Sequence, residues 1–111
     1  MNRLQIEWGN VGRSEAIEQY ITQKSEKIFM LSPEATKLVV YCRVINPIHS
    51  AGQPRQKISM ELRLPQHQDL RAENEGKDLY KCIRDSKQAL LAQIKSRKQI
   101  SHDRAVDLLV A

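Results

Sequence analysis

The sequence lacks several features that would place it in familiar classes. No apolar run approaches the roughly 20 residues that a membrane-spanning helix needs. The opening segment, MNRLQIEWGN, has no long apolar core, so we expect no signal peptide. Cysteine is scarce, and Cys42 and Cys82 lie far apart without metal-ligand spacing. Both have apolar neighbours, which predicts buried thiols. These absences indicate a cytoplasmic protein with no disulfide framework and no cofactor.

Signals for catalysis are also sparse. His49, His67 and His102 fall in predicted loop or tail segments, without a Ser or Cys nucleophile arranged around them. The chain contains neither a paired-carboxylate motif nor a phosphate-binding loop. GNVG, at residues 9–12, matches the G-x-x-G loop of KH domains, but here it follows a strand, so we interpret it as a plain turn. We therefore predict that the protein is not an enzyme.

Positive charge is concentrated in one segment of this 111-residue chain. The net charge is +5, with 18 basic and 13 acidic residues. The segment from Lys77 to Lys98 holds seven of the basic residues and two of the acids, so it contains the whole surplus. A surplus of positive charge indicates an anionic partner.

The hydrophobic pattern predicts an α+β fold. Apolar alternation and β-branched residues indicate strands at 4–8, 37–45, 57–64 and 69–74, and helical periodicity indicates helices at 15–29 and from 79 to about 98. Ser14 and Asp78 are the expected N-caps. The order β-α-β-β-β-α predicts a two-layer sandwich, in which both helices cover one face of a four-stranded mixed sheet.

This order assigns residues 1–98 to one domain and leaves 99–111 as a C-terminal tail. For the tail, the sequence leaves open a frayed helix or a loose segment. Strict alternation in the third strand places Ile58, Met60, Leu62 and Leu64 inward. On the last helix the core face is expected to contain Leu79, Cys82, Ile83, Ser86, Leu90 and Ile94.

The basic residues of the last helix fall on one flank, away from this core face. At 100° per residue, most of them occupy one sector, together with the uncharged Gln88 and Leu91. A solvated face normally mixes signs, because like charges one turn apart repel. We therefore predict an anion-binding surface, with a bland solvated face as the alternative. Its candidate residues are Lys77, Lys81, Arg84, Lys87, Lys95 and Lys98, extended by Lys24 and Lys27 of the first helix.

Motifs that would accompany these charges in DNA-binding and RNA-binding proteins indicate which kind of nucleic acid is bound. No recognition-helix, zinc-finger or basic-zipper pattern is present. The outward residues of the third predicted strand include no aromatic side chain, which argues against the stacking platform of an RNA-recognition motif. Recognition of the backbone and shape of structured RNA is favoured.

The segment EGKDLYKCIRDSKQALLAQIKSRK, after three strands, resembles the ribosome hibernation-promoting factor family, also called ribosome-associated inhibitor A or sigma-54 modulation protein. The matching residues are Gly76, Asp78, Leu79, Tyr80, Ile83, Gln93 and the basic end. GNVGRSEAIEQYITQKSEKI and LVVYCRV also fit the family's first helix and second strand. The resemblance covers residues 4 to about 98.

The resemblance implies a fold similar to double-stranded RNA-binding domains. It also implies binding to 16S rRNA of the small ribosomal subunit, in the channel used by mRNA and tRNA, and inhibition of translation under stress or in stationary phase. With 13 residues after Lys98, the chain looks like a short family member, which is not expected to pair ribosomes alone. No membrane or small-molecule partner is expected.

The alternative is a protein-interaction or self-associating regulatory module. Val39, Tyr41 and Ile45 are predicted to expose apolar groups on the open sheet face, where they could form an interface. The apolar tail residues Val106, Leu108, Leu109 and Val110 could cover that face or bind a second chain as a weak homo-oligomer.

Overall fold

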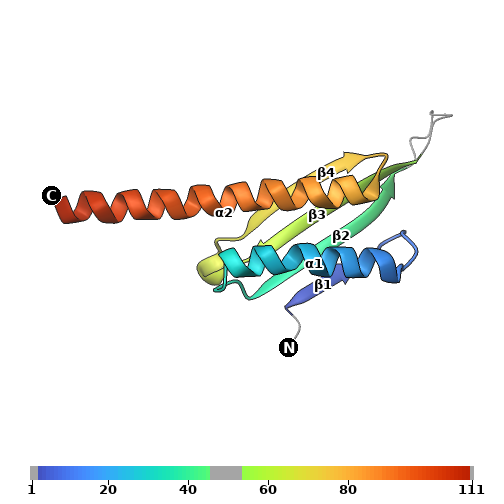
Figure 1. Cartoon of the computed structure of the whole chain (residues 1–111), viewed down its shortest axis with the longest axis horizontal. Helices are drawn as coiled ribbons and strands as arrows, with labels where there is room; N and C mark the ends of the chain where they lie inside the picture. The colour runs from blue at the N-terminus through green and yellow to red at the C-terminus, as the bar shows by residue number, and fades with distance from the viewer. Residues whose placement is uncertain (1–2, 46–53, 111) are drawn as a thin grey trace.

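Two helices cover one face of a four-stranded sheet (Figure 1). The computed structural model describes residues 3–45 and 54–110, with side chains up to residue 97. The elements are β1 (Leu4–Glu7), α1 (Glu15–Leu31), β2 (Lys37–Ile45), β3 (Arg55–Arg63), the 3-10 turn η1 (Pro65–His67), β4 (Leu70–Gly76) and α2 (Leu79–Val110). The predicted element order and α+β class are confirmed.

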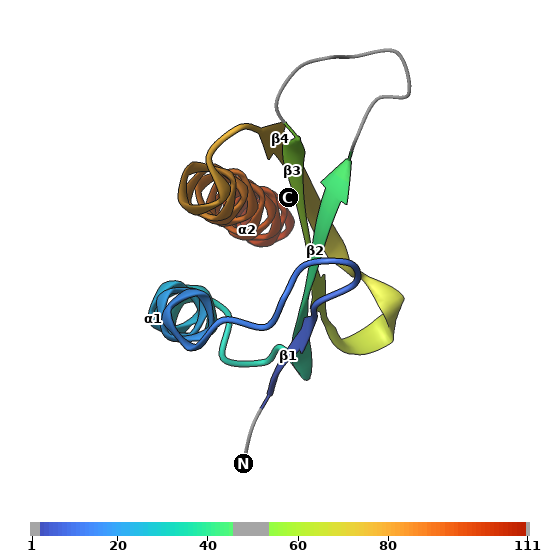
Figure 2. The same cartoon turned by 90° about the vertical axis from the view of Figure 1, so that its right-hand side faces the viewer.

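The strands lie in the order β1-β2-β3-β4. β1 and β2 are parallel, because α1 returns the chain to the same end of the sheet between them. β2 with β3 and β3 with β4 are antiparallel neighbours. In Figure 2 both helices lie on the same side of the sheet, and its other face is open.

The core lies between the helices and the sheet. In β3, the side chains of Ile58, Met60 and Leu62 are at most 1% exposed, so the predicted alternation is confirmed. The strand begins at Arg55, earlier than expected, and Leu64 is buried just beyond its end. Large-to-small changes at such sites typically cost about 2–5 kcal/mol, so these residues hold the helices to the sheet.

Both helices begin at the predicted caps. Ser14 Oγ accepts a hydrogen bond from the backbone N–H of Ile17 at 3.4 Å. Asp78 Oδ1 accepts from the N–H groups of Tyr80 at 3.0 Å and Lys81 at 3.4 Å. These carboxyl and hydroxyl oxygens satisfy N–H groups that have no partner within the helix, which fixes where each helix begins.

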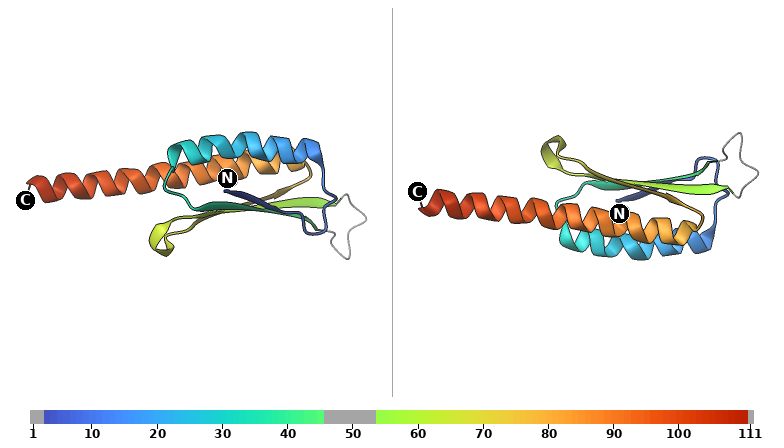
Figure 3. Two further views of the ribbon diagram at one scale, coloured as in Figure 1. Left: turned by 90° about the horizontal axis from the view of Figure 1, so that it is seen from below. Right: turned by 90° about the horizontal axis from the view of Figure 1, so that it is seen from above.

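α2 is longer than the sequence predicted. Its backbone remains helical from Leu79 to Val110 and extends past the end of the sheet (Figures 1 and 3). The sequence left open a frayed helix or a loose segment for the tail, and the structure shows a helical backbone as far as residue 110. The side chains of Lys98, His102 and the apolar tail residues lie outside the described part, as does the loop at 46–53 with His49.

Val39 and Leu91 were both predicted to be exposed and are buried. Val39, expected on the open face, is 1% exposed, because the longer side chains of Gln5 and Glu61 stand on either side of it in the neighbouring strands. Leu91, expected among the basic residues, is 5% exposed and belongs to the core cluster, because α1 packs against that flank of α2.

Candidate nucleic-acid interface

The exposed surface of α2 carries the cations that the sequence predicted there. Lys81, Arg84 and Lys95 are exposed on the helix, and Lys77 is exposed directly before it. The opposite side of α2 is anchored to the sheet by buried residues, Ile83 and Leu90 among them. α2 is thus a wall of the core on one side and a basic surface on the other.

α1 adds cations on the flank that faces α2. Lys24 Nζ lies 5.0 Å from the centre of the Tyr20 ring, and this ring packs edge-on against Tyr80 of α2, with centroids 4.9 Å apart. Lys87 lies on the facing flank of α2, close enough to Lys24 and Lys27 for their positive charges to contribute to lowering its pKa. The structure therefore brings Lys24, Lys27 and Lys87 together, and we name these three the interhelix lysine cluster.

The folded protein disfavours the charged form of Lys87. Partial burial, and then the positive charges of Lys24 and Lys27, lower the pKa of Lys87. The lowered pKa means that the protonated ammonium group is penalised in the folded protein. A bound anion would offset this penalty, so the arrangement favours anion binding.

The lysines of the helical layer have no acidic partners. Among the residues whose side chains are described, none of these lysines makes an ion pair: Lys24, Lys27, Lys77, Lys81, Lys87 and Lys95. Arg84 differs, because its Nε lies 3.8 Å from Asp85. Arg97 lies 3.9 Å from Glu34 and hydrogen-bonds Gln68, so it ties α2 to two turns and is a structural cation.

The far flank of α1 limits this basic surface. A shallow groove there is lined by Glu15, Glu18 and Glu26 together with uncharged polar residues. Tyr20 and Lys24, which face α2, lie on the other flank of the same helix. An anionic ligand would therefore lie along α2 and the α1/α2 seam and avoid the outer flank of α1.

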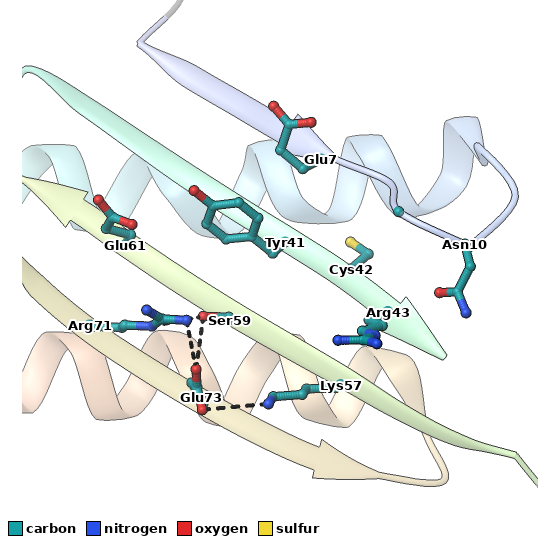
Figure 4. Close-up of a pocket in the computed structure, with 11 residues that line it drawn as sticks. Glu7, Asn10, Tyr41, Cys42, Arg43, Lys57, Ser59, Glu61, Arg71 and Glu73 are labelled. Carbon is teal, nitrogen blue, oxygen red and sulfur yellow. Dashed lines mark hydrogen bonds and ion pairs between the residues drawn. The ribbon is translucent and has the colours of Figure 1, made fainter. Parts of the chain in front are cut away.

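The open face of the sheet has a different charge arrangement (Figure 4). A depression of about 650 Å³ lies there, around Tyr41. Glu73 pairs with Arg71 at 2.8 Å and with Lys57 at 3.8 Å, and Arg71 also donates to Ser59 Oγ at 3.2 Å.

Two further pairs neutralise cations on this face. Arg55 pairs with Glu75 and Arg63 with Glu61, each at 3.2 Å. Most cations of the open face thus already have carboxylate partners. This face is a weaker candidate for a polyanion than the helical layer.

The GNVG segment is a turn, as interpreted from the sequence. Asn10 Nδ2 donates to the carbonyl oxygen of Val44 at 2.9 Å, and the N–H of Val44 donates to Asn10 Oδ1 at 2.8 Å. The amide side chain thereby continues the backbone pairing of β1 with β2 beyond the end of β1. These two hydrogen bonds give the loop a structural role, which is to join β1 to the end of β2.

The two cysteines lack the character of reactive thiols. Both cysteines are free and buried, and burial raises the pKa of the Cys42 thiol to about 11, which leaves very little thiolate at neutral pH. In the described ranges, no cluster of three His, Cys, Asp or Glu side chains is placed to hold a metal ion. Within the same ranges, every helix is too short or too polar to pass through a bilayer.

The fold and its charges define a class: a two-layer α+β domain whose helical layer carries six lysines that make no ion pair among the residues with described side chains. The chain belongs to the family described as sigma 54 modulation protein / S30EA ribosomal protein, whose family model matches residues 4–101. The resemblance inferred from the sequence is confirmed.

Solved structures are similar to this chain, and two of them illustrate the likeness. One is a ribosomal subunit interface protein from Coxiella burnetii, with 20% identity and a TM-score of 0.70, covering 86% of this chain and 97% of that one. The other is the N-terminal domain of Protein Y from Thermus thermophilus, with 26% identity and a TM-score of 0.57, covering 86% and 98%. The first supports the fold alone. No curated protein sequence matches the chain.

Proposed function

We propose that this protein is a ribosome hibernation factor. It binds 16S rRNA in the mRNA and tRNA channel of the small ribosomal subunit, and it inhibits translation under stress or in stationary phase. Family membership supports a ribosomal partner, and such a partner implies a cytoplasmic protein. The observation that carries the proposal is the helical layer, where six lysines have no acidic partner among the residues with described side chains.

The geometry suits a phosphate backbone. From Lys81 to Lys95 the helix advances about 21 Å at 1.5 Å per residue, which is long enough to meet several phosphates in succession. Each lysine that neutralises a phosphate releases a counterion, so affinity should fall steeply with salt. The site residues in this proposal are Lys77, Lys81, Arg84, Lys87, Lys95, Lys98, Lys24 and Lys27.

The test compares two charge-matched double variants. Lys81→Glu/Lys95→Glu reverses two charges on α2, and Lys37→Glu/Arg43→Glu reverses two on the open sheet face. All four cations lack an ion pair among the described residues, so neither variant breaks one. Co-sedimentation of each protein with purified small subunits, at about 50 and 200 mM salt, measures binding.

We expect the α2 variant to lose binding at the higher salt, while the sheet variant binds like the wild type. Sucrose gradients with added wild-type protein should place it on small subunits, and a reconstituted translation reaction should slow in its presence. Equal binding by both variants would show that the helical layer is not the binding surface. If the wild-type protein does not bind small subunits, the proposed function is wrong.

A further inference from the structure

Tyr80 is an exposed aromatic side chain in the first turn of α2, between Lys77 and Lys81 in the sequence. Its relative exposure is 42%, and within the described ranges only Met30 is another large hydrophobic side chain of that degree of exposure. A tyrosine combines an apolar ring with a polar hydroxyl group, so its ring can lie at the surface and remain accessible to a ligand. The accessible ring offers a contact for a flat ligand.

The position of Tyr80 is fixed from two directions. Its backbone N–H donates to Asp78 Oδ1 at 3.0 Å, which holds the first turn of α2. Its ring meets Tyr20 of α1 at an interplanar angle of 81°. Tyr20 is itself half-buried against the core cluster, so it is a firm support. The exposed ring is preorganised, which lowers the entropy lost when a ligand binds.

Cations surround this aromatic pair. Lys24 lies over the Tyr20 ring, and Lys27 and Lys87 complete the interhelix lysine cluster. Lys87 lies about 10 Å along α2 from Tyr80, at 1.5 Å per residue. A ligand that matches both features has a flat ring for the tyrosine and negative charge nearby for the lysines. A nucleotide within an RNA strand has both.

We infer that Tyr80 stacks on an unpaired RNA base whose neighbouring phosphates are bound by Lys24, Lys27 and Lys87. The inference rests on the proposed function and adds a base contact to a surface otherwise expected to bind phosphates. Stacking on an aromatic ring tolerates any base, because every base has a π-face. The site therefore selects an unstacked nucleotide, as in a loop or a single strand, and not a particular sequence.

The test uses two variants and the salt dependence of binding to small subunits. Tyr80→Phe keeps the ring, and Tyr80→Leu removes it. Loss of one stacked base should weaken binding roughly 5- to 150-fold, since stacking contributes about 1–3 kcal/mol per base. A stacking contact releases no counterion, so the slope of log K against log salt should stay unchanged. Lys87→Gln should instead lower that slope by about one unit.

A second measurement asks whether the partner is a base. The probes are single-stranded RNA oligonucleotides of about ten nucleotides, one intact and one with abasic sites. The wild type should prefer the intact strand, and Tyr80→Leu should lose that preference. Unfolding curves of each variant check that the fold is retained, and Tyr80→Phe, which keeps the contact with Tyr20, should bind like the wild type.

The outcomes separate this inference from the proposed function. If the wild type binds small subunits and Tyr80→Leu binds equally well, the stacking inference is wrong and the function stands. If Tyr80→Leu weakens subunit binding but intact and abasic strands bind alike, Tyr80 contacts a ribosomal protein, and the inference is again wrong. If the wild type does not bind subunits, the proposed function is wrong. The stacking inference is then tested only by whether the wild type prefers the intact RNA strand to the abasic one.

Discussion

Gly9 occupies a backbone position that other residues adopt at a cost. Its φ is +57°, and a Cβ added there would lie 2.6 Å from the carbonyl oxygen of Cys42. The left-handed conformation costs an L-residue about 1–2 kcal/mol, and the forced contact adds a similar amount. We expect Gly9→Ala to lower the free energy of unfolding by about 2–4 kcal/mol, measured by urea denaturation.

Gly12, in the same turn, provides a matched control. It has no positive φ, and a Cβ there would meet nothing within 4 Å. Gly12→Ala should leave the free energy of unfolding unchanged or raise it by up to about 1 kcal/mol, because alanine restricts the unfolded chain. Similar losses in both variants would contradict the strain assigned to Gly9.

At the scale of elements, the two helices approach each other through like charges. Lys87→Gln removes the ammonium group that Lys24 and Lys27 repel. Because the side chain is partly exposed and screened by solvent, the gain in folding stability should be small, about 0.2–0.5 kcal/mol. We expect a slightly higher unfolding temperature at low salt, an advantage that shrinks as salt screens the cluster.

Lys95→Gln is the companion variant for this experiment. Lys95 is exposed further along the same helix and lies outside the interhelix lysine cluster. Both variants should bind small subunits more weakly, but only Lys87→Gln should gain stability. If Lys95→Gln gains as much folding stability as Lys87→Gln, the gain comes from the lower net charge of the protein and not from the interhelix lysine cluster.

The elements themselves were largely predictable from local patterns. Alternation located β2 and β3, and the side-chain oxygens of Ser14 and Asp78 marked both helix starts. The end of α2 was missed, because no glycine or proline follows Lys98 to stop the helix. The last part of α2 extends beyond the sheet, so the core-facing periodicity that marks a packed helix is not required there.

For the molecule as a whole, α2 raises the question of where the domain ends. Among the side chains described, the last buried residue of α2 is Ile94, and the C-terminal part of the helix extends beyond the sheet (Figure 1). Stability follows buried apolar area. A chain of residues 1–98 should therefore unfold within about 1 kcal/mol of the full chain and retain binding to small subunits.

A shorter truncation tests the same boundary from the other side. A chain of residues 1–89 lacks Leu90, Leu91 and Ile94, all of them buried in the core cluster. Each should cost about 2–5 kcal/mol, which exceeds what a small domain can lose, so we expect this chain to be unfolded by circular dichroism. If the 1–98 chain is also unfolded, the predicted domain limit is too short.

The sequence by itself determined the element order, the inward faces of the strands and the helix that carries the surplus charge. These follow from periodicity, capping and charge counts, which are local properties of the chain. It also contained the family resemblance, to which Gly76, Asp78 and Tyr80 contribute, and the family itself is confirmed by the match over residues 4–101.

Tertiary structure decided which flanks face one another. A helical wheel places Leu91 among the basic residues of α2, and only the packing of α1 buries it. The same packing brings Tyr20 to Tyr80 and Lys24 to Lys87, across about sixty residues of sequence. Periodicity describes one element at a time, so the seam between two helices, and the aromatic contact inferred there, exists only in the folded chain.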